Sequence, residues 1–298
     1  MRRRFTTLDV FTAQRFAGNP LAVVRDGEEL DTAAMQAVAR EFNLPETVFL
    51  LPPAEPSHRA RLRIFTPASE LPFAGHPTVG TAVLLGLDKG ADTQEMLLGE
   101  AIGPVRCAFE RRGPDVGSAR FDVPRLPERL SDTGEASEVA AALGLTLDDL
   151  GCGDFELGRW SAGVAFAMIP LRGLDAVARS RPDPTHWEEA FGATGPRAAY
   201  VYCRETVEPG HAFHARMFAP HMGIPEDPAT GSAAAAFAGV VARHGGLPDG
   251  EHALVIEQGF EMGRRSLIRL TLTLVGGALT AAAIGGEAVK VSEGVIEA

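Results

Sequence analysis

Two copies of one short motif carry different titratable residues. The sequence GHPTVGTA occupies residues 75–82, and EDPATGSA occupies residues 226–233, about half of the 298-residue chain later. Position for position, His76 in the first copy stands where Asp227 stands in the second. Two similar loops with different titratable groups are what an asymmetric proton-transfer site needs, so this pair is the first candidate for acid–base chemistry.

Glu46 is the third candidate for proton transfer. It begins the apolar run TVFLL, and the corresponding place in the second half, near Ala198, is not acidic. A charge present in only one half is better explained by function than by a shared fold. Two structural alternatives stay open: Glu46 could be a solvated strand end, and Asp227 before Pro228 could be an ordinary N-cap.

Each motif is expected to open a helix, whose first N–H groups and positive dipole end favour an anion. If the two loops face each other, Thr230, Gly231 and Ser232 would bind a substrate carboxylate or an enolate-like intermediate. The alternative is that these small residues only allow close packing of the helix that follows.

The repeat extends upstream and predicts the same order of elements in both halves. RIFTP precedes the first motif and RMFAP precedes the second. Apolar periodicity and turn residues predict strands and helices in each half. The first half has strands at 5–12, 21–24, 47–51 and 59–67, a helix after the N-cap Asp31, and a helix opened by His76 and Pro77. The second half has strands at 164–171, 199–203 and 211–220, a helix from Asp183 to Gly192, a helix at 229–244 capped by Gly245, and strands at 254–257, 267–274 and 279–284.

One helix among many strands in each half predicts an α+β fold: two pseudo-symmetric domains, each a β-barrel wrapped around a central α-helix. Gly80 and Gly231 would let the helices approach the sheet closely. A turn-rich linker at 124–136 sets the boundaries, with an N-terminal domain at 1–125 and a C-terminal domain at 126–298. The last strands could pack back on the first domain.

Composition excludes several function classes. The net charge of −11 argues against nucleic acid as a partner, and no apolar run is long enough to span a bilayer. Three scattered cysteines indicate neither a disulfide framework nor a thiolate metal site, and the expected location is the cytoplasm. His211 and His214 could ligate a metal, but their spacing favours opposite faces of a strand. Nucleotide, zinc-protease and serine-hydrolase motifs are absent, so no metal and no cofactor are expected.

The same residues resemble the phenazine biosynthesis PhzF-like family over nearly the whole chain. The similar motifs are DVF at 9–11, GNPLAVV at 18–24, NLPETVF at 43–49, RIFTP at 63–67, ELPFAGHPTVG at 70–80 and EDPATGSA at 226–233. The resemblance implies the diaminopimelate-epimerase fold, an active site between the two barrels, and a homodimer. Related racemases use two cysteines, but Ala74 and Pro228 stand near those positions here, which disfavours a two-thiol mechanism.

The resemblance also implies a reaction, the isomerisation of trans-2,3-dihydro-3-hydroxyanthranilate by proton transfer. In that scheme Glu46 is the acid/base, His76 and Asp227 orient the substrate and help move protons, and Ser232 binds it. Gly75 and Asn19 lie in the matching motifs and complete the expected substrate-binding set with Thr230 and Gly231. Pro45 departs from the serine that the family often has. Two alternatives stay open: another acid/base enzyme acting on a small carboxylate, such as an epimerase or dehydratase, and a non-catalytic small-molecule binding protein.

Overall fold

The computed structural model describes residues 1–192 and 197–298 and divides them into two compact units. The N-terminal unit comprises Met1–Pro124 and Ile284–Ala298, and the C-terminal unit comprises Arg125–Ala283. The end of the chain therefore belongs to the first unit. Among the described residues, no helix combines the length and apolarity that a membrane span requires.

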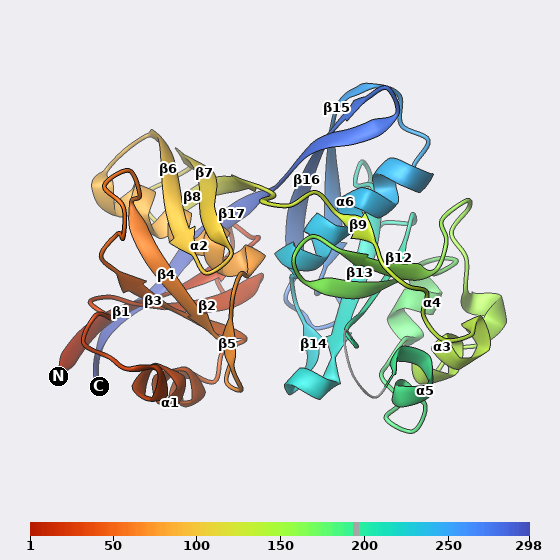
Figure 1. The fold of residues 1–298 in the computed structure, drawn as a ribbon, viewed down its shortest axis with the longest axis horizontal. Helices are drawn as coiled ribbons and strands as arrows, with labels where there is room; N and C mark the ends of the chain where they lie inside the picture. Colours follow the sequence, from red (N-terminus) through yellow and green to blue (C-terminus); the bar gives the residue numbers. More distant parts are fainter. Residues whose placement is uncertain (193–196) are drawn as a thin grey trace. The chain divides into compact units, whose positions relative to one another are not determined.

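The strands of the N-terminal unit close into a barrel (Figure 1). Its elements are β1 (Arg2–Val10), β2 (Asn19–Val24), α1 (Thr32–Phe42), β3 (Glu46–Leu51), β4 (Ala60–Phe65), β5 (Glu70–Leu71), α2 (Gly75–Lys89), β6 (Thr93–Glu100), β7 (Gly103–Arg111), β8 (Val116–Asp122) and β17 (Ala278–Glu297), of which the last begins in the C-terminal unit. Pairing runs β1-β2-β3-β4-β6-β7-β8-β17 and returns from β17 to β1. The predicted barrel of the first half is thus an eight-stranded one.

Helix α2 is enclosed by this barrel. It contacts β1, β2, β3, β6, β7 and β8, and every residue from Gly75 to Leu87 is buried. A helix that is apolar on all sides is stable only inside a protein. Gly80 permits the close approach that its sequence position predicted, because a Cβ there would lie 2.6 Å from Leu21 Cδ2 and 2.8 Å from Val10 Cγ2.

The C-terminal unit wraps strands around a second small-residue helix. Its elements are β9 (Glu128–Arg129), α3 (Ala136–Ala142), β10 (Gly158–Ser161), β11 (Ala165–Pro170), α4 (Leu174–Arg179), α5 (Trp187–Phe191), β12 (Ala199–Cys203), β13 (Phe213–Ala219), β14 (Ile224–Asp227), α6 (Gly231–His244), β15 (Gly250–Gln258) and β16 (Ser266–Val275), with short 3₁₀ turns at Leu147–Asp149 and Pro220–Met222. Helix α6 packs against β9, β10, β11 and β16.

The strand pairings repeat between the two units. Antiparallel β1-β2 corresponds to β10-β11, parallel β2-β3 to β11-β12, and antiparallel β3-β4 to β12-β13. The series continues with antiparallel β4-β5 and β13-β14, parallel β4-β6 and β13-β15, and antiparallel β6-β7 and β15-β16. This shared topology confirms the predicted pseudo-symmetric fold, and it fixes which residues are equivalent.

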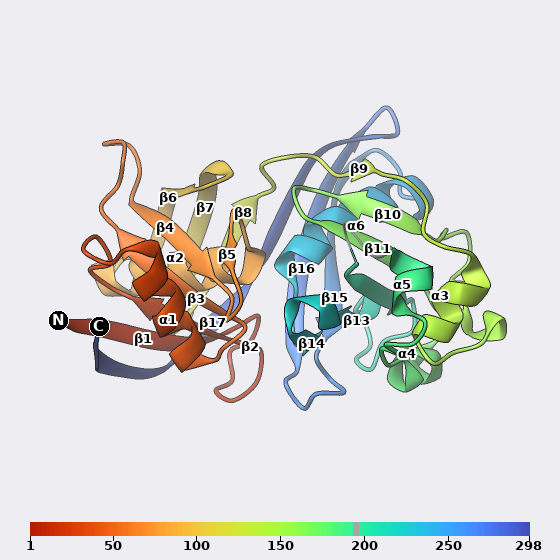
Figure 2. The same cartoon turned by 60° about the horizontal axis from the view of Figure 1, so that its bottom comes forward.

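Additional helices cover the outer faces of both units (Figure 2). Helix α1 packs Met35, Val38 and Ala39 against side chains of β2, β3 and β4. Helices α3, α4 and α5 form a larger apolar cluster with β11 and β12. Of these helices, α1 was predicted from its apolar spacing and α5 lies within the helix predicted from Asp183 to Gly192, whereas α3 and α4 were not predicted. Each buries one face and adds to an outer layer.

Three segments differ from the sequence-based prediction. Residues 93–122 form β6, β7 and β8, to which no element had been assigned, because polar residues on their outward faces dilute the apolar signal. The linker at 124–136 contains β9, which pairs with β10. The helix expected to open at Asp183 begins at Trp187 instead, since the Asp183 carboxylate accepts from the Thr185 N–H in a local turn.

We expect Gly86→Ala to lower the free energy of unfolding. A Cβ at this α2 position would meet the ring of Phe109 on β7. Overpacking of this kind costs about 1–3 kcal/mol, which exceeds the roughly 1 kcal/mol that alanine gains in helix propensity. Chemical denaturation of the single variant and of Gly86→Ala in a Phe109→Ala background measures the coupling. An equal effect in both backgrounds would contradict this packing argument.

Candidate functional site

The structure brings Glu46 and His76 together in the N-terminal unit. Glu46 is the first residue of β3 and pairs with Leu21 of β2, whereas His76 is the second residue of α2. Nδ1 of His76 lies 3.1 Å from Oε2 of Glu46, with the two side chains 3% and 13% exposed. A carboxylate and an imidazole in contact at a largely buried place form a pair that can hold and transfer a proton.

The imidazole of His76 is neutral in this pair. Burial lowers its pKa to about 3, and a hydrogen bond with the backbone carbonyl of Pro20 acts in the opposite direction without restoring the usual value. Since Nδ1 faces Glu46, we assign the proton to Nδ1. Nε2 is buried and has no hydrogen-bond partner among the described residues, so its lone pair can accept a proton or hydrogen bond from a substrate.

Asn19 belongs to the same neighbourhood in the N-terminal unit. It is fully buried, begins β2 and pairs with Val10 of β1. The residue after it is Pro20, whose carbonyl bonds to His76. In the loop before Asn19, Phe16 has a φ of 70° and donates its N–H to Asp9 Oδ2 at 2.6 Å. The first two residues of β2 therefore have separate roles: Asn19 pairs with β1, and the carbonyl of Pro20 holds the imidazole of His76.

Asp227 lies in a second polar cluster, within the C-terminal unit. Its carboxylate Oδ2 accepts a hydrogen bond from Thr230 Oγ1 at 2.5 Å, and both residues are buried. Gln258, at the end of β15, donates from Nε2 to Asp227 O at 2.8 Å and to Thr230 Oγ1 at 3.0 Å. Its Oε1 accepts from the Thr230 N–H at 3.2 Å. Gln258 thus holds the segment that carries Asp227, a role that the sequence analysis missed.

The helix predicted at 229–244 begins later, at Gly231. Asp227 is the last residue of β14 and pairs with Met217, so it belongs to a strand rather than to a helix N-cap. The amide of Gln258 takes the hydrogen bonds that a first helical turn would otherwise provide. Gly259 follows with a φ of +75°, and a Cβ there would lie 2.5 Å from Pro228 O. Only glycine permits this approach without strain.

Both motif helices begin without a side-chain cap. The N-cap residues are Ala74 for α2 and Thr230 for α6, and neither makes a side-chain cap bond. By contrast, Asp31 caps α1 by accepting from the Ala34 N–H at 2.8 Å. The first N–H groups of α2 and α6, which include those of the predicted binding residues Gly75, Gly231 and Ser232, are therefore not occupied by a capping side chain.

The register explains why Glu46 has no acidic counterpart. Thr47 pairs with Phe65 and Ala199 pairs with Phe218, which makes Ala198 the equivalent of Glu46. This is the counterpart expected from the repeat. The predicted residues therefore form two groups of four, with Asn19, Glu46, Gly75 and His76 in the N-terminal unit and Asp227, Thr230, Gly231 and Ser232 in the C-terminal unit.

His211 and His214 do not lie on opposite faces of a strand, so that prediction was wrong. The strand β13 begins at Phe213, after His211, and both imidazoles reach the buried carboxylate of Glu257. Nδ1 of His211 and Nδ1 of His214 each lie 2.8 Å from one Glu257 oxygen, and Nε2 of His214 lies 2.8 Å from Glu261. Although burial acts to lower the pKa of His214, Glu261 and Glu257 raise it overall. The two histidines therefore form a hydrogen-bonded network with Glu257 and Glu261 that has a structural role.

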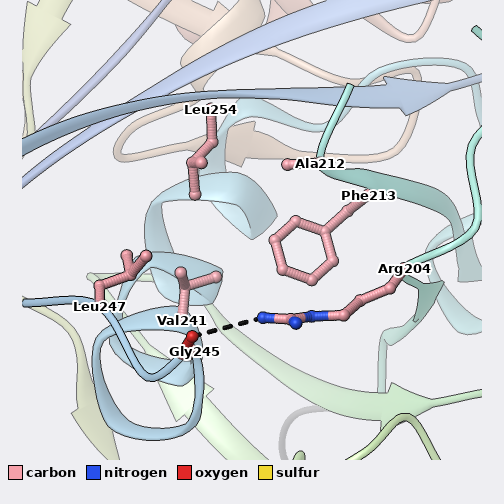
Figure 3. A pocket seen from close by; sticks show the side chains of 7 residues that line it. All are labelled: Arg204, Ala212, Phe213, Val241, Gly245, Leu247 and Leu254. Atoms are coloured by element: carbon pink, nitrogen blue, oxygen red, sulfur yellow. Dashed lines mark hydrogen bonds between the residues drawn. The ribbon is translucent and has the colours of Figure 1, made fainter. Parts of the chain in front are cut away.

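A cavity in the C-terminal unit contains none of the predicted residues (Figure 3). Its volume is about 300 Å³, and it is lined by Arg204, Ala212, Phe213, Val241, Gly245, Leu247 and Leu254. The guanidinium of Arg204 donates to Gly245 O at 3.4 Å and lies over the ring of Phe155. The cavity is mostly apolar, and Arg204 is the one charged residue among those that line it.

The sequence matches the phenazine biosynthesis-like protein family, PhzC-PhzF, over residues 8–294. The chain belongs to the phenazine biosynthesis-like family. An uncharacterized isomerase of Mesorhizobium japonicum is 51% identical to it over 296 residues, covering 98% of each chain. The trans-2,3-dihydro-3-hydroxyanthranilate isomerase of Pseudomonas fluorescens is 33% identical over 292 residues, also covering 98% of each.

Solved structures of phenazine biosynthesis-like proteins have the same fold. The crystal structure of the Bacillus anthracis PhzF family protein superimposes with a TM-score of 0.89 over the full length of both chains, at 24% identity. This likeness confirms the fold, and the relatives of higher identity identify this family member as an isomerase.

We expect acid to destabilise the protein through His76. Its pKa is about 3 in the folded state against 6.5 in an exposed imidazole, so the unfolded chain binds a proton first between these values. Stability that is present at neutral pH is therefore lost as the pH falls below 6.5, by up to about 1.4 kcal/mol per pH unit.

Urea denaturation from pH 5 to 7 tests this by comparing the wild type with His76→Gln, with His58→Gln as a control for a partly exposed histidine of the same unit. The wild type should lose more stability than His76→Gln as the pH falls. Parallel pH profiles of these two proteins would show that His76 is not held neutral.

Proposed function

We propose that this isomerase moves a proton between carbon atoms of a small carboxylate substrate by acid–base catalysis, with no cofactor. The observation that carries the proposal is the 3.1 Å contact between Glu46 Oε2 and the buried Nδ1 of His76. A proton shift within one molecule needs one group that removes a proton and returns it at another atom, and a carboxylate can do both.

Each residue has a stated role in this proposal. Glu46 takes the proton from carbon and returns it, and His76 lies beside the Glu46 carboxylate with its Nδ1 while its Nε2 accepts a hydrogen bond from the substrate. Asp227, fixed by Thr230 and Gln258, orients the substrate from the second motif. The uncapped N–H groups near Gly75, Gly231 and Ser232 bind its carboxylate or the negative charge that develops during the reaction, and Asn19 contributes a further polar contact.

The substrate class follows from relatives. Curated relatives at 33% identity are trans-2,3-dihydro-3-hydroxyanthranilate isomerases, and we propose a compound of this kind, a small cyclic amino carboxylate. A homodimer, which the family resemblance implies, and a cytoplasmic location, which the scattered cysteines favour, also belong to the proposal.

We expect Glu46→Gln to abolish turnover, because the amide keeps the shape of the side chain but cannot accept the proton. Loss of a general acid–base group lowers kcat by about 10²–10⁴-fold. NMR in D2O with trans-2,3-dihydro-3-hydroxyanthranilate measures isomerisation and deuterium incorporation together, after dialysis against a chelator.

The matched control is Glu55→Gln, which changes an exposed carboxylate in the loop after β3 and should leave the rate unchanged. Unchanged deuterium incorporation in Glu46→Gln would exclude Glu46 as the base. Deuterium exchange that inverts a stereocentre without moving a double bond would identify an epimerase.

A further inference from the structure

Glu100 and Gln258 occupy the same position in the two barrels. The repeated strands β4 and β13 align through Arg63 and Arg216, which makes Arg61 equivalent to His214. Arg61 pairs with Gly99 of β6, and His214 pairs with Glu257 of β15. The next residue of each strand is the last one, Glu100 in β6 and Gln258 in β15.

Both side chains reach the beginning of the enclosed helix. Gln258 bonds to the Asp227 carbonyl and to Thr230, immediately before α6. Oε1 of Glu100 lies 2.7 Å from Oγ1 of Thr78, two residues after His76 in α2. The equivalent strand ends thus secure the two segments that carry the predicted titratable residues, one with an amide and the other with a carboxyl group.

The hydrogen bonds around Thr78 favour a proton on Glu100. Oγ1 of Thr78 is 2.7 Å from Ala74 O as well as 2.7 Å from Glu100 Oε1, and a hydroxyl has one hydrogen to donate. The carbonyl of Ala74 can only accept. When Glu100 is protonated it donates to Thr78, whose hydroxyl then donates to Ala74, and each atom of the chain is satisfied.

The surroundings of Glu100 favour the neutral form. Its side chain is buried, and Oε2 has no hydrogen-bond partner among the described residues. Burial raises its pKa to about 8, and a hydrogen bond donated by Thr78 to the ionised form would act against this shift without cancelling it. An ionised carboxylate with an unsatisfied buried oxygen would be costly, whereas a carboxylic acid loses much less on burial.

No neighbouring charge compensates Glu100 within the described part of the barrel. On β7 the buried thiol of Cys107 is a titratable group that interacts with Glu100, and burial raises its own pKa. Helix α2 contributes His76, which is neutral. The remaining charges near Cys107 are the carboxylates Glu95 and Asp122, of which Asp122 faces Arg106 at the surface.

We propose that Glu100 is a neutral carboxylic acid which does in the N-terminal barrel what the Gln258 amide does in the C-terminal one, and that it is a positioning residue for the first turn of α2 and hence for His76. The claim about its protonation stands on the contacts alone. Only the consequence for turnover rests on the proposed function.

The first test measures the free energy of unfolding of three proteins between pH 5 and pH 9. They are the wild type, Glu100→Gln, whose amide matches that of Gln258 in the second barrel, and Glu100→Ala. The ordinary carboxyl pKa of 4.5 applies to the unfolded chain, so the folded wild type binds the extra proton between 4.5 and about 8. Wild-type stability relative to Glu100→Gln should therefore fall as the pH rises, and the ratio of their unfolding constants should change up to about tenfold per pH unit. Glu95→Gln, an exposed carboxylate of the same strand, is the control and should parallel the wild type.

Infrared spectroscopy of the wild type at pH 6 and pH 9 provides a second readout that needs no variant to fold. The carbonyl band of a protonated carboxyl group should be present at pH 6, vanish at pH 9 and be absent from Glu100→Gln. Parallel stability profiles, or no such band at pH 6, would overturn the proposal.

Turnover adds a third comparison. Glu100→Gln should retain kcat and extend it to higher pH, whereas Glu100→Ala should lower it at least tenfold at every pH. Equal losses in both variants would overturn the positioning role. If the wild type does not act on trans-2,3-dihydro-3-hydroxyanthranilate, the proposed substrate fails, while the infrared and unfolding measurements still decide the state of Glu100.

Discussion

Enclosing a helix inside a strand barrel is the constraint on which the rest of this structure depends. Residues 75–87 of α2 are all buried, so its N-terminal polar groups cannot rely on water. Partners must come from the surrounding strands. For α2, the side chain at the end of β6 bonds to Thr78 and the carbonyl of Pro20 bonds to His76, while the side chain at the end of β15 bonds to the segment before α6. The same strands that bury the first turn of α2 therefore also provide its hydrogen-bond partners.

The two barrels share one backbone topology but carry different titratable side chains at equivalent positions. Equivalent pairings build both barrels, yet His76 contacts Glu46 in one, whereas Asp227 contacts Thr230 in the other. Burial acts on two groups of the N-terminal unit in opposite directions, since it lowers the pKa of His76 and raises that of Glu100. Both shifts favour the neutral form at physiological pH, because a low-dielectric interior disfavours charge of either sign.

The C-terminal unit treats buried charge differently, by pairing it. Glu257 accepts from the N–H groups of Val207 and Glu208 as well as from two histidines, and its pKa is lowered despite burial. Arg216 holds Glu226 through two 2.8 Å hydrogen bonds beside Asp227, and its Nη1 also donates to carbonyls at the end of α4. These paired charges fix the strand and loop on either side of the second motif.

The sequence alone determined the repeat, the exchange of His76 for Asp227, the single acidic Glu46, the barrel fold and the Asp31 cap, because these follow from residue types and short-range periodicity. Only the tertiary structure decided that Glu100 and Gln258 are equivalent, that two histidines share Glu257, and that α6 begins after Asp227. Such contacts join residues far apart in the chain, and the pKa of a group depends on how deeply the fold buries it. Neither strand register nor burial is encoded in the spacing of neighbouring residues.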